Sequence, residues 1–248
     1  MKACVNAFRI QKAGNAASEY EDSFWPLKPC EITLPTRIAV ADGATDAVYS
    51  GLWANILVRA WGQKRINGDT LSQEIAKKSS VWKRIIRDRQ LPWYVEEKAR
   101  LGTYAALLGL ELHHIPGSSA GTWSAIACGD CCLFQIRGKE LITRFPVSCA
   151  DDFSNAPVLL STNNMNGEDV GAIQAANGTW EEEDIFYLMT DALACWFLRQ
   201  CESGSVPWQL LSDISFTENP SFSTWVADLR DRQELKNDDC TLVSVSFE

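Results

Sequence analysis

The spacing of apolar residues predicts short strands at the start of the chain and helices directly after them. Loose alternation, broken by frequent turn residues, is typical of strands that reverse direction quickly. Apolar residues then recur at helical spacing and predict three helices. The predicted strands cover 4–10, 21–27, 31–34 and 38–41, and the predicted helices cover 48–61, 71–89 and 95–113.

The second half of the chain returns to strands and ends with helices and a last strand. Gly129-Asp130 and Gly138-Lys139 are turn pairs that join three predicted strands into a meander. The polar segment 148–180 follows; segments of this length are often functional, so we expect a mobile cover with a short helix at 172–176. The predicted strands cover 122–128, 131–137, 141–145, 185–190 and 241–247, and the predicted helices cover 191–201, 206–213 and 221–232.

The order of these elements favours two packed sheets over a single parallel sheet. Strands and helices do not alternate strictly, which argues against a doubly wound fold. Two mainly antiparallel sheets covered by helices, an α+β arrangement, fit the pattern better. No linker or internal repeat interrupts the sequence, so we expect a single domain spanning residues 1–248.

Composition excludes several classes of partner. The net charge of −9 argues against a general binder of nucleic acid or anionic membranes, and it is compatible with a site that concentrates carboxylates for cations. No apolar run approaches the roughly 20 residues that a membrane span requires. The N-terminal stretch lacks the long apolar core of a signal peptide, so we expect a cytoplasmic protein.

The cysteines and histidines do not form a recognisable metal or catalytic motif. Nine cysteines at irregular spacing predict small buried residues rather than disulfides. Cys128 and Cys131 have a zinc-ligand spacing, but no second ligand pair accompanies them. The two histidines, His113 and His114, are adjacent, so their side chains diverge, and we interpret them as polar residues at a helix end.

Acidic residues stand at the ends of several predicted strands. Asp42-Gly43, Asp130 and Asp191 follow such strands, Asp238-Asp239 precedes the last strand, and Glu21-Asp22 begins an early strand. A carboxylate at the end of a buried strand is held rigidly beside a crevice. We expect these acids to meet at one site; the alternative is that each residue caps its own turn.

The chemistry of such a site would be that of hard divalent cations. Carboxylate and main-chain oxygens favour Mg²⁺ or Mn²⁺, and Gly43 would let a backbone carbonyl approach a metal. Clustered carboxylates without a metal repel one another and raise their pKa values. Two divalent ions would relieve this repulsion and acidify a water for attack on a phosphate ester.

Five short motifs, taken in order, resemble those of the metal-dependent type 2C Ser/Thr protein phosphatases, the PPM family, and of its divergent bacterial members. The resemblance runs from about residue 5 to the C-terminus. The motifs are Gly14…Glu21-Asp22, Val40-Ala-Asp42-Gly43, Gly121…Cys128-Gly129-Asp130, Leu188-Met-Thr-Asp191 and Asn237-Asp238-Asp239-Cys-Thr241.

This resemblance implies a four-layer α-β-β-α sandwich with a two-metal site between the sheet edges. Asp42 would bridge both metals, and Gly43 would offer its carbonyl oxygen. Asp191 and Asp238 would hold the first metal and, with Asp42, would be the catalytic residues. Two further roles follow: Glu21 and Asp22 would act near the second metal through waters, and Asp130 would help to hold a third, weaker metal. The segment 150–180 falls where the family carries a variable flap.

The sequence also departs from the family pattern. Ala17 stands where the family has a phosphate-binding arginine, and Lys12 or Arg9 could take its place. Ala44-Thr45 follows Asp42-Gly43 where the eukaryotic pattern has His-Gly, Ala192 stands where a glycine is usual, and Cys195 replaces the last aspartate of the third metal site. The sequence assigns no substrate-binding residue.

Three hypotheses follow. The first is a phosphoprotein phosphatase that hydrolyses phosphomonoesters with a water or hydroxide bridging two Mg²⁺ or Mn²⁺ ions. Its partner would be a protein phosphorylated by a Ser/Thr kinase, and we expect a monomer. The second is a weak or inactive relative that binds a phosphoprotein or another partner as a regulator. The third is a set of unrelated turn aspartates.

Overall fold

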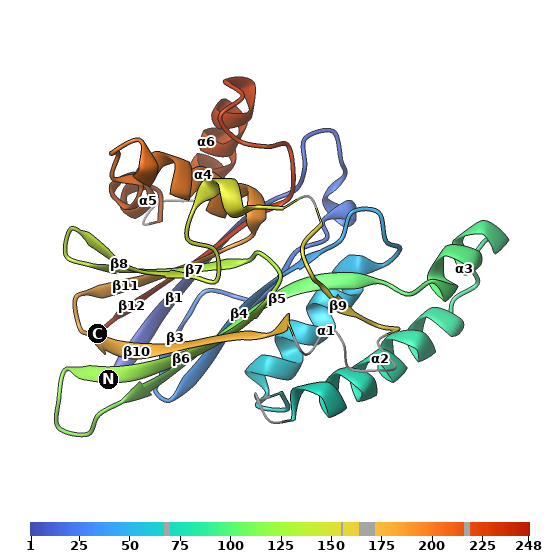
Figure 1. Ribbon diagram of the computed structural model, residues 1–248, viewed down its shortest axis with the longest axis horizontal. Helices are drawn as coiled ribbons and strands as arrows, with labels where there is room; N and C mark the ends of the chain where they lie inside the picture. The colour runs from blue at the N-terminus through green and yellow to red at the C-terminus, as the bar shows by residue number, and fades with distance from the viewer. Residues whose placement is uncertain (67–69, 155, 164–171, 216–218) are drawn as a thin grey trace.

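Two six-stranded sheets lie face to face in the middle of the molecule, and helices cover the outer side of each (Figure 1). The computed structural model describes residues 1–66, 70–154, 156–163, 172–215 and 219–248. Every strand pairing within these residues is antiparallel. The predicted α+β, four-layer α-β-β-α architecture is therefore confirmed.

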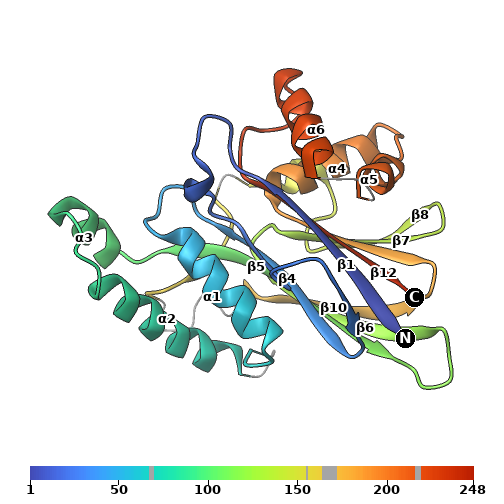
Figure 2. The same cartoon turned by 180° about the vertical axis from the view of Figure 1, so that it is seen from behind.

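The first sheet contains both ends of the chain, in the order β3-β1-β12-β11-β7-β8. β1 and β12 pair along their whole length, with Ala3 opposite Phe247 and Ile10 opposite Cys240 (Figure 2). Its strands are β1 (Lys2–Ile10), β3 (Cys30–Thr33), β7 (Cys132–Arg137), β8 (Glu140–Phe145), β11 (Asp184–Met189) and β12 (Cys240–Phe247).

The second sheet has the order β10-β6-β5-β4-β2, with the short β9 paired to β5. β2 lies at its edge and ends directly before Pro26, which cannot donate to a sheet ladder. The strands are β2 (Ser23–Trp25), β4 (Thr36–Gly43), β5 (Tyr104–His114), β6 (Ala120–Cys128), β9 (Leu160–Ser161) and β10 (Gln174–Glu181).

Helices form the two outer layers. The first three pack on the side of the second sheet, and the last three pack on the first sheet. They are α1 (Ser50–Gly62), α2 (Leu71–Arg87), α3 (Trp93–Arg100), α4 (Asp191–Glu202), α5 (Pro207–Ser215) and α6 (Asn219–Asp231), with short 3₁₀ turns at Ala17–Glu19 and Ala150–Asp152. None of these helices, within the residues described, is long and apolar enough to cross a membrane.

Alternate residues of the inner strands fill the space between the sheets. Val40 and Leu108 of the second sheet face Leu188 and Val243 of the first, and all four are fully buried. The neighbouring residues on β4 and β5 point outward, beneath α1 and α2. Both faces of these strands are therefore apolar, and this rigid double layer fixes the positions of the strand ends.

The predicted helix over 95–113 is wrong in its larger part. α3 ends at Arg100, and Gly102 follows with a φ of +84°, a conformation that favours glycine. β5 then begins at Tyr104. Its leucines are buried on both faces, so the segment shows no period of two and cannot be told from a buried helix by pattern alone.

Two further expectations differ from the structure. The short helix expected at 172–176 is replaced by β10, which begins at Gln174 and pairs with β6. Residues 164–171 of the expected cover lie outside the described part of the chain. His113 and His114 end a strand, not a helix, and the His114 ring bonds to the carbonyl oxygen of Ser118.

Candidate functional site

Asp42 and Gly43 end β4 at one rim of the sandwich. They pair with Ala106 and Ala105 of β5, which hold the strand in register. Gly43 leaves room for its neighbours: a Cβ there would lie 2.7 Å from the backbone carbon of Ser50 and 2.8 Å from the carbonyl oxygen of Glu21. Glycine at this position therefore lets the Glu21 segment and the start of α1 close against the strand end.

Asp191 and Asp238 come from the first sheet at the same rim. Because β11 and β12 are antiparallel neighbours, with Met189 opposite Leu242, the end of one lies beside the start of the other. Each carboxylate is oriented by a backbone amide, with Oδ1 of Asp191 2.6 Å from the Ala192 nitrogen and Oδ1 of Asp238 3.1 Å from the Asp239 nitrogen. The second oxygen of each, Oδ2, faces the ammonium of Lys236, which lies 3.3 Å from that of Asp191 and 2.7 Å from that of Asp238.

Asp22 is buried beneath this pair, with only 3 % of its surface exposed. Its Oδ2 accepts hydrogen bonds from the hydroxyls of Thr190, at 3.0 Å, and Thr241, at 2.7 Å. Its Oδ1 has no hydrogen-bond partner among the residues that the structure describes. A buried carboxylate oxygen without a partner is costly, so this atom is suited to a cation or a water.

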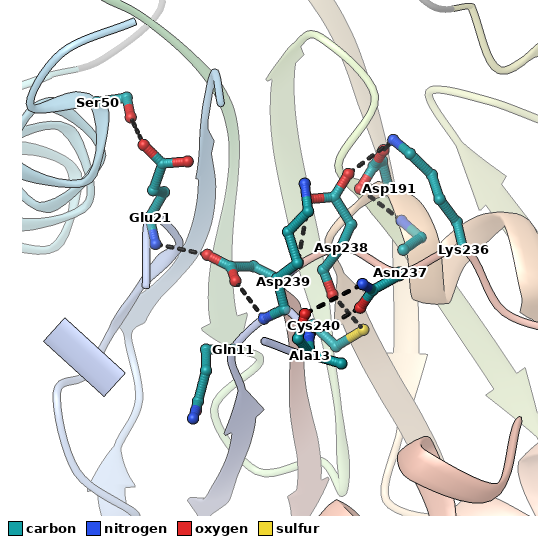
Figure 3. A network of polar contacts seen from close by, with 12 residues as sticks. Gln11, Ala13, Glu21, Ser50, Asp191, Lys236, Asn237, Asp238, Asp239 and Cys240 are labelled. Carbon is teal, nitrogen blue, oxygen red and sulfur yellow. Dashed lines mark hydrogen bonds and ion pairs between the residues drawn. The ribbon is translucent and has the colours of Figure 1, made fainter. Parts of the chain in front are cut away.

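Asp239 joins the early acidic pair to the last strand (Figure 3). Its Oδ1 accepts the backbone amide of Lys12 at 2.7 Å, and its Oδ2 accepts that of Glu21 at 2.6 Å. The Glu21 carboxylate in turn accepts the Ser50 hydroxyl at 2.5 Å. These contacts hold the β1–β2 segment and α1 at the rim where the other acids lie.

A cavity of about 390 Å³ opens at this rim. A second cavity, of about 480 Å³, is lined by Glu21 and Ser50. Thr45 lines both cavities, so the two lie side by side. Asp22 lies below and lines neither. The first cavity thus brings together five of the seven residues that the sequence predicts as metal ligands, together with two lysines: Asp42, Gly43, Asp130, Asp191, Asp238, Lys12 and Lys236.

The overall arrangement closely matches solved structures of protein phosphatases. The Mycobacterium tuberculosis serine/threonine phosphatase PstP superposes with a TM-score of 0.60 at 13% identity, covering 100% of both chains. The PstP catalytic domain in complex with two manganese ions gives 0.55 at 14% identity, covering 98% of each chain. PppA, described as a key regulatory component of a secretion system (T6SS) in Pseudomonas aeruginosa, gives 0.54 at 14% identity, covering 98% of this chain and 97% of PppA.

The chain has the type 2C protein phosphatase fold. No protein-family model matches the sequence, and no curated protein is similar enough to count as a match. The likeness at 13–14% identity therefore concerns the fold, and the chemistry depends on the residues of this chain.

Burial and neighbouring charges raise the pKa values of several carboxyl groups at this site. Burial, followed by the charges of Asp22, Asp191 and Asp130, raises the pKa of Asp42 well above its ordinary value. Burial and Asp191 raise the pKa of Asp130 to about 6. Burial also raises the pKa of Glu21, although the Ser50 hydroxyl opposes this shift. The site therefore has more negative charge than its own lysines neutralise.

The donor set fits hard divalent cations in its chemistry. It consists of carboxylate oxygens, among them the unpartnered oxygen of Asp22, and the carbonyl oxygen of Gly43, and Mg²⁺ and Mn²⁺ accept oxygen ligands of both kinds. Across the described residues, no three Asp, Glu, His or Cys side chains are grouped so that they could hold a metal.

Sequence reasoning assigns no role to several residues that shape the site. Asp239 belongs to the acids expected to meet there, and Thr241 belongs to one of the five motifs, but only the strand register shows that these two residues and Thr190 position the acids rather than face the cavity. Lys236 stands two positions before Asp238, a signal that the sequence did contain. Partial burial, the largest single effect, lowers the pKa of the Lys236 ammonium. The charges of Asp191 and Asp238 and their hydrogen bonds together outweigh it, so the pKa lies above its ordinary value.

The structure also separates the two cations considered as substitutes for the missing arginine. Lys12 lines the acidic cavity, and its Nζ lies 3.8 Å from Oδ1 of Asp238. The guanidinium of Arg9 instead lies over the ring of Tyr20, 5.2 Å from its centroid. Cys195, which replaces the third-site aspartate, lines an adjoining cavity of about 170 Å³ with Asp130 and Asp191.

Proposed function

We propose that this protein is a Mg²⁺- or Mn²⁺-dependent phosphatase of Ser/Thr phosphoproteins, formed by a single domain over residues 1–248. The observation that carries the proposal is the convergence of Asp42, Asp130, Asp191 and Asp238 in one cavity, with too few cations to balance them. Carboxyl groups such as those of Asp42 and Asp130, whose pKa values are raised by burial and by neighbouring charges in a cleft, are typical of functional sites.

In this proposal the carboxylates of Asp42, Asp191 and Asp238 and the carbonyl oxygen of Gly43 would hold two divalent ions. Glu21 and Asp22 would contribute to the second of these ions, and Asp130 would contribute to a weaker third. When bound, such ions polarise a phosphoryl oxygen and lower the pKa of water, which suits hydrolysis of a phosphomonoester. That a solved structure of this fold contains two manganese ions supports this assignment.

The residues of this chain would orient the substrate. Lys12 places an ammonium group at the mouth of the cavity, where it can bind a phosphate oxygen and hold the phosphorus in line with the acids. Asp239 keeps Lys12 in place through its backbone amide. A lysine offers a point charge and not the two-pronged contact of an arginine, so the grip on phosphate is weaker than in an enzyme with arginine.

We further propose that the protein works as a monomer in the cytoplasm on proteins phosphorylated by a Ser/Thr kinase. All nine cysteines lie in the described part of the chain as free thiols, which is typical of a reducing compartment. The acidic net charge disfavours nucleic acid as a partner.

The test is hydrolysis of a phosphothreonine peptide and of an aryl phosphate with Mn²⁺. We expect activity in the wild type that falls by at least about 100-fold in Asp42→Ala and Asp191→Ala, since each removes a metal ligand. Asp88→Ala, at the exposed end of α2, is the control. Equal activity in all four proteins would refute the proposal.

A second candidate function is a non-catalytic phosphoprotein binder with the same fold. Three features favour it. Ala17 and Cys195 replace the phosphate-binding arginine and the third-site aspartate of the family pattern, and the ammonium of Lys236 contacts Asp191 and Asp238, two proposed metal ligands. Calorimetry would distinguish the two functions, because a binder would take up Mn²⁺ or a phosphopeptide without releasing phosphate from any ester.

A further inference from the structure

The two proposed ligands of the first metal are already joined by one cation. Nζ of Lys236 lies 2.7 Å from Oδ2 of Asp238 and 3.3 Å from Oδ2 of Asp191 (Figure 3). The other oxygen of each carboxylate accepts a backbone amide. The ammonium therefore takes the oxygen on each acid that remains for a metal ion.

The loop that carries Lys236 is fixed on both sides. The Arg230 guanidinium donates to the Asp238 carbonyl at 2.5 Å and to the Gln11 carbonyl at 3.1 Å. The Asn237 side chain exchanges two hydrogen bonds with the backbone of Ala13, at 2.8 and 3.2 Å. Because these hydrogen bonds hold the backbone of the loop, the Lys236 ammonium is positioned between Asp191 and Asp238.

The lysine side chain itself can leave without disturbing this loop. It is 62% exposed, while the carboxylates that it joins are each 19% exposed. A four-carbon stem at the edge of the cavity has open solvent into which it can turn. In the described part of the chain, the ion pairs of both cavity lysines end on Asp191 and Asp238 and leave Asp42 and Asp130 without one.

We propose that Lys236 is an internal cation that occupies the place between Asp191 and Asp238 and competes there with a divalent metal. This inference rests on the proposed function for the identity of the metal ligands. Without metal, the ammonium balances the charges of the two carboxylates. Metal binding has to displace it, so Lys236 sets the metal concentration at which the site fills.

The test measures Mn²⁺ binding directly, with no phosphoester present. Lys236→Met keeps the length of the side chain and removes its charge, and Lys236→Gln is a second variant should the first fold poorly. Lys139→Met, in the exposed β7–β8 turn, is the matched control. We expect the Lys236 variants to bind Mn²⁺ about tenfold more tightly, because no internal cation competes, while the control matches the wild type.

A second measurement is thermal unfolding in EDTA. The Lys236 variants should melt at a lower temperature than the wild type and the control, because Asp191 and Asp238 then repel without a counter-ion. Added Mn²⁺ should remove this difference. Unchanged or weaker Mn²⁺ binding by the Lys236 variants, or no Mn²⁺ binding by any of the proteins, would overturn the proposal. Tighter binding without any hydrolysis would support it and refute the phosphatase function separately.

A second, independent observation concerns the surface of α2 and α3. A cavity of about 440 Å³ lies between them, on an apolar floor of Trp82, Ile86 and Ala99. Four cationic side chains and one acidic side chain surround this floor, in a chain whose net charge is −9. The charged residues are Lys83, Arg87, Arg89, Arg100 and Glu96.

This basic cavity adjoins a middle cavity, lined by Glu21 and Ser50, which in turn borders the acidic one. The Arg89 guanidinium lies over the ring of Tyr49, 4.7 Å from its centroid. Tyr49 and Val95 of α3 line the middle cavity together with Thr45, which also lines the acidic cavity. A polypeptide held at the acids could therefore extend to α3, where Trp93 and Tyr94 are 76% and 57% exposed.

We infer that this surface binds an acidic, partly apolar segment of the phosphoprotein substrate. The inference extends the proposed function, but its test does not need catalysis. A labelled glutamate-rich peptide with a central phenylalanine and no phosphate is titrated in EDTA and followed by fluorescence anisotropy. We expect Arg87→Glu and Arg89→Glu each to weaken binding about tenfold, whereas Lys139→Glu, with the same change of charge, leaves it unchanged. Equal weakening by all three variants, or no binding by the wild type, would overturn the inference.

Discussion

Asp239 accepts the backbone amide of Glu21 at 2.6 Å, although 218 positions separate the two residues. The same carboxylate accepts the amide of Lys12. One side chain at the start of β12 thus fixes the segment that carries both the early acidic pair and the cation nearest to the proposed phosphate site. It acts by positioning other groups, since it does not line the cavity.

Asp239→Ala should lower the free energy of unfolding by about 2–4 kcal/mol, because it removes two hydrogen bonds to a charged acceptor and leaves two amides unpaired. Asp239→Asn keeps one acceptor oxygen and should cost less than the alanine variant. Urea denaturation followed by circular dichroism measures both. Equal stability of the alanine variant and the wild type would show that the two contacts contribute nothing.

The metal-free protein should lose stability as the pH rises. The pKa values of Asp22 and Asp42 are raised well above normal, and that of Asp130 is raised to about 6. The folded state therefore holds protons that the unfolded state has released, and stability falls as the pH passes from the unfolded pKa of about 4 upward through the folded values.

Thermal melts in EDTA between pH ~5 and ~7 check this pH dependence. Asp130→Asn should remove the part of the decline that ends near pH 6, because the folded state releases the Asp130 proton there. Saturating Mn²⁺ should flatten the whole profile in the wild type, since the metal favours the ionised carboxylates. A stability that rises with pH in EDTA would contradict the prediction.

Lys12 and Arg9 offer a matched pair for locating the phosphate contact. Lys12→Met should lower kcat/KM for a phosphopeptide by about tenfold, because it removes the ammonium that faces the cavity. Arg9→Met should leave it unchanged, since that guanidinium lies over Tyr20. The wild type and both variants are compared at saturating Mn²⁺. An equal loss in both variants would point to a general effect of charge.

Gly43→Ala tests how closely the strand end must pack. The new Cβ would lie under 3 Å from the backbone of Ser50 and from that of Glu21, so the rim has to open. We expect a loss of about 1–3 kcal/mol in stability and weaker Mn²⁺ binding. Gly117→Ala, where nothing lies within 4 Å, serves as the comparison and should leave Mn²⁺ binding unaltered. Unaltered Mn²⁺ binding in both variants would show that the packing at Gly43 does not shape the site.

The sequence by itself determined the fold class and the acidic character of the rim. The acidic rim is a local feature, because a strand that ends on Asp42-Gly43 is recognisable from a few residues. The order of the five acidic motifs was also enough to predict the four-layer sandwich. The sequence could not separate strand from helix over 95–113, because β5 is buried on both faces and its apolar run has no period.

Only the tertiary structure decided which side chains support the acids and which cations reach them. Thr190 and Thr241 bond to Asp22 because β11 and β12 pair in one particular register. Lys12 enters the cavity while Arg9 turns to Tyr20, a choice that depends on side-chain direction along β1 and its following segment. The ammonium of Lys236 joins Asp191 and Asp238 only once two distant segments meet. Such contacts arise from long-range pairing, which leaves no periodic signal in the sequence.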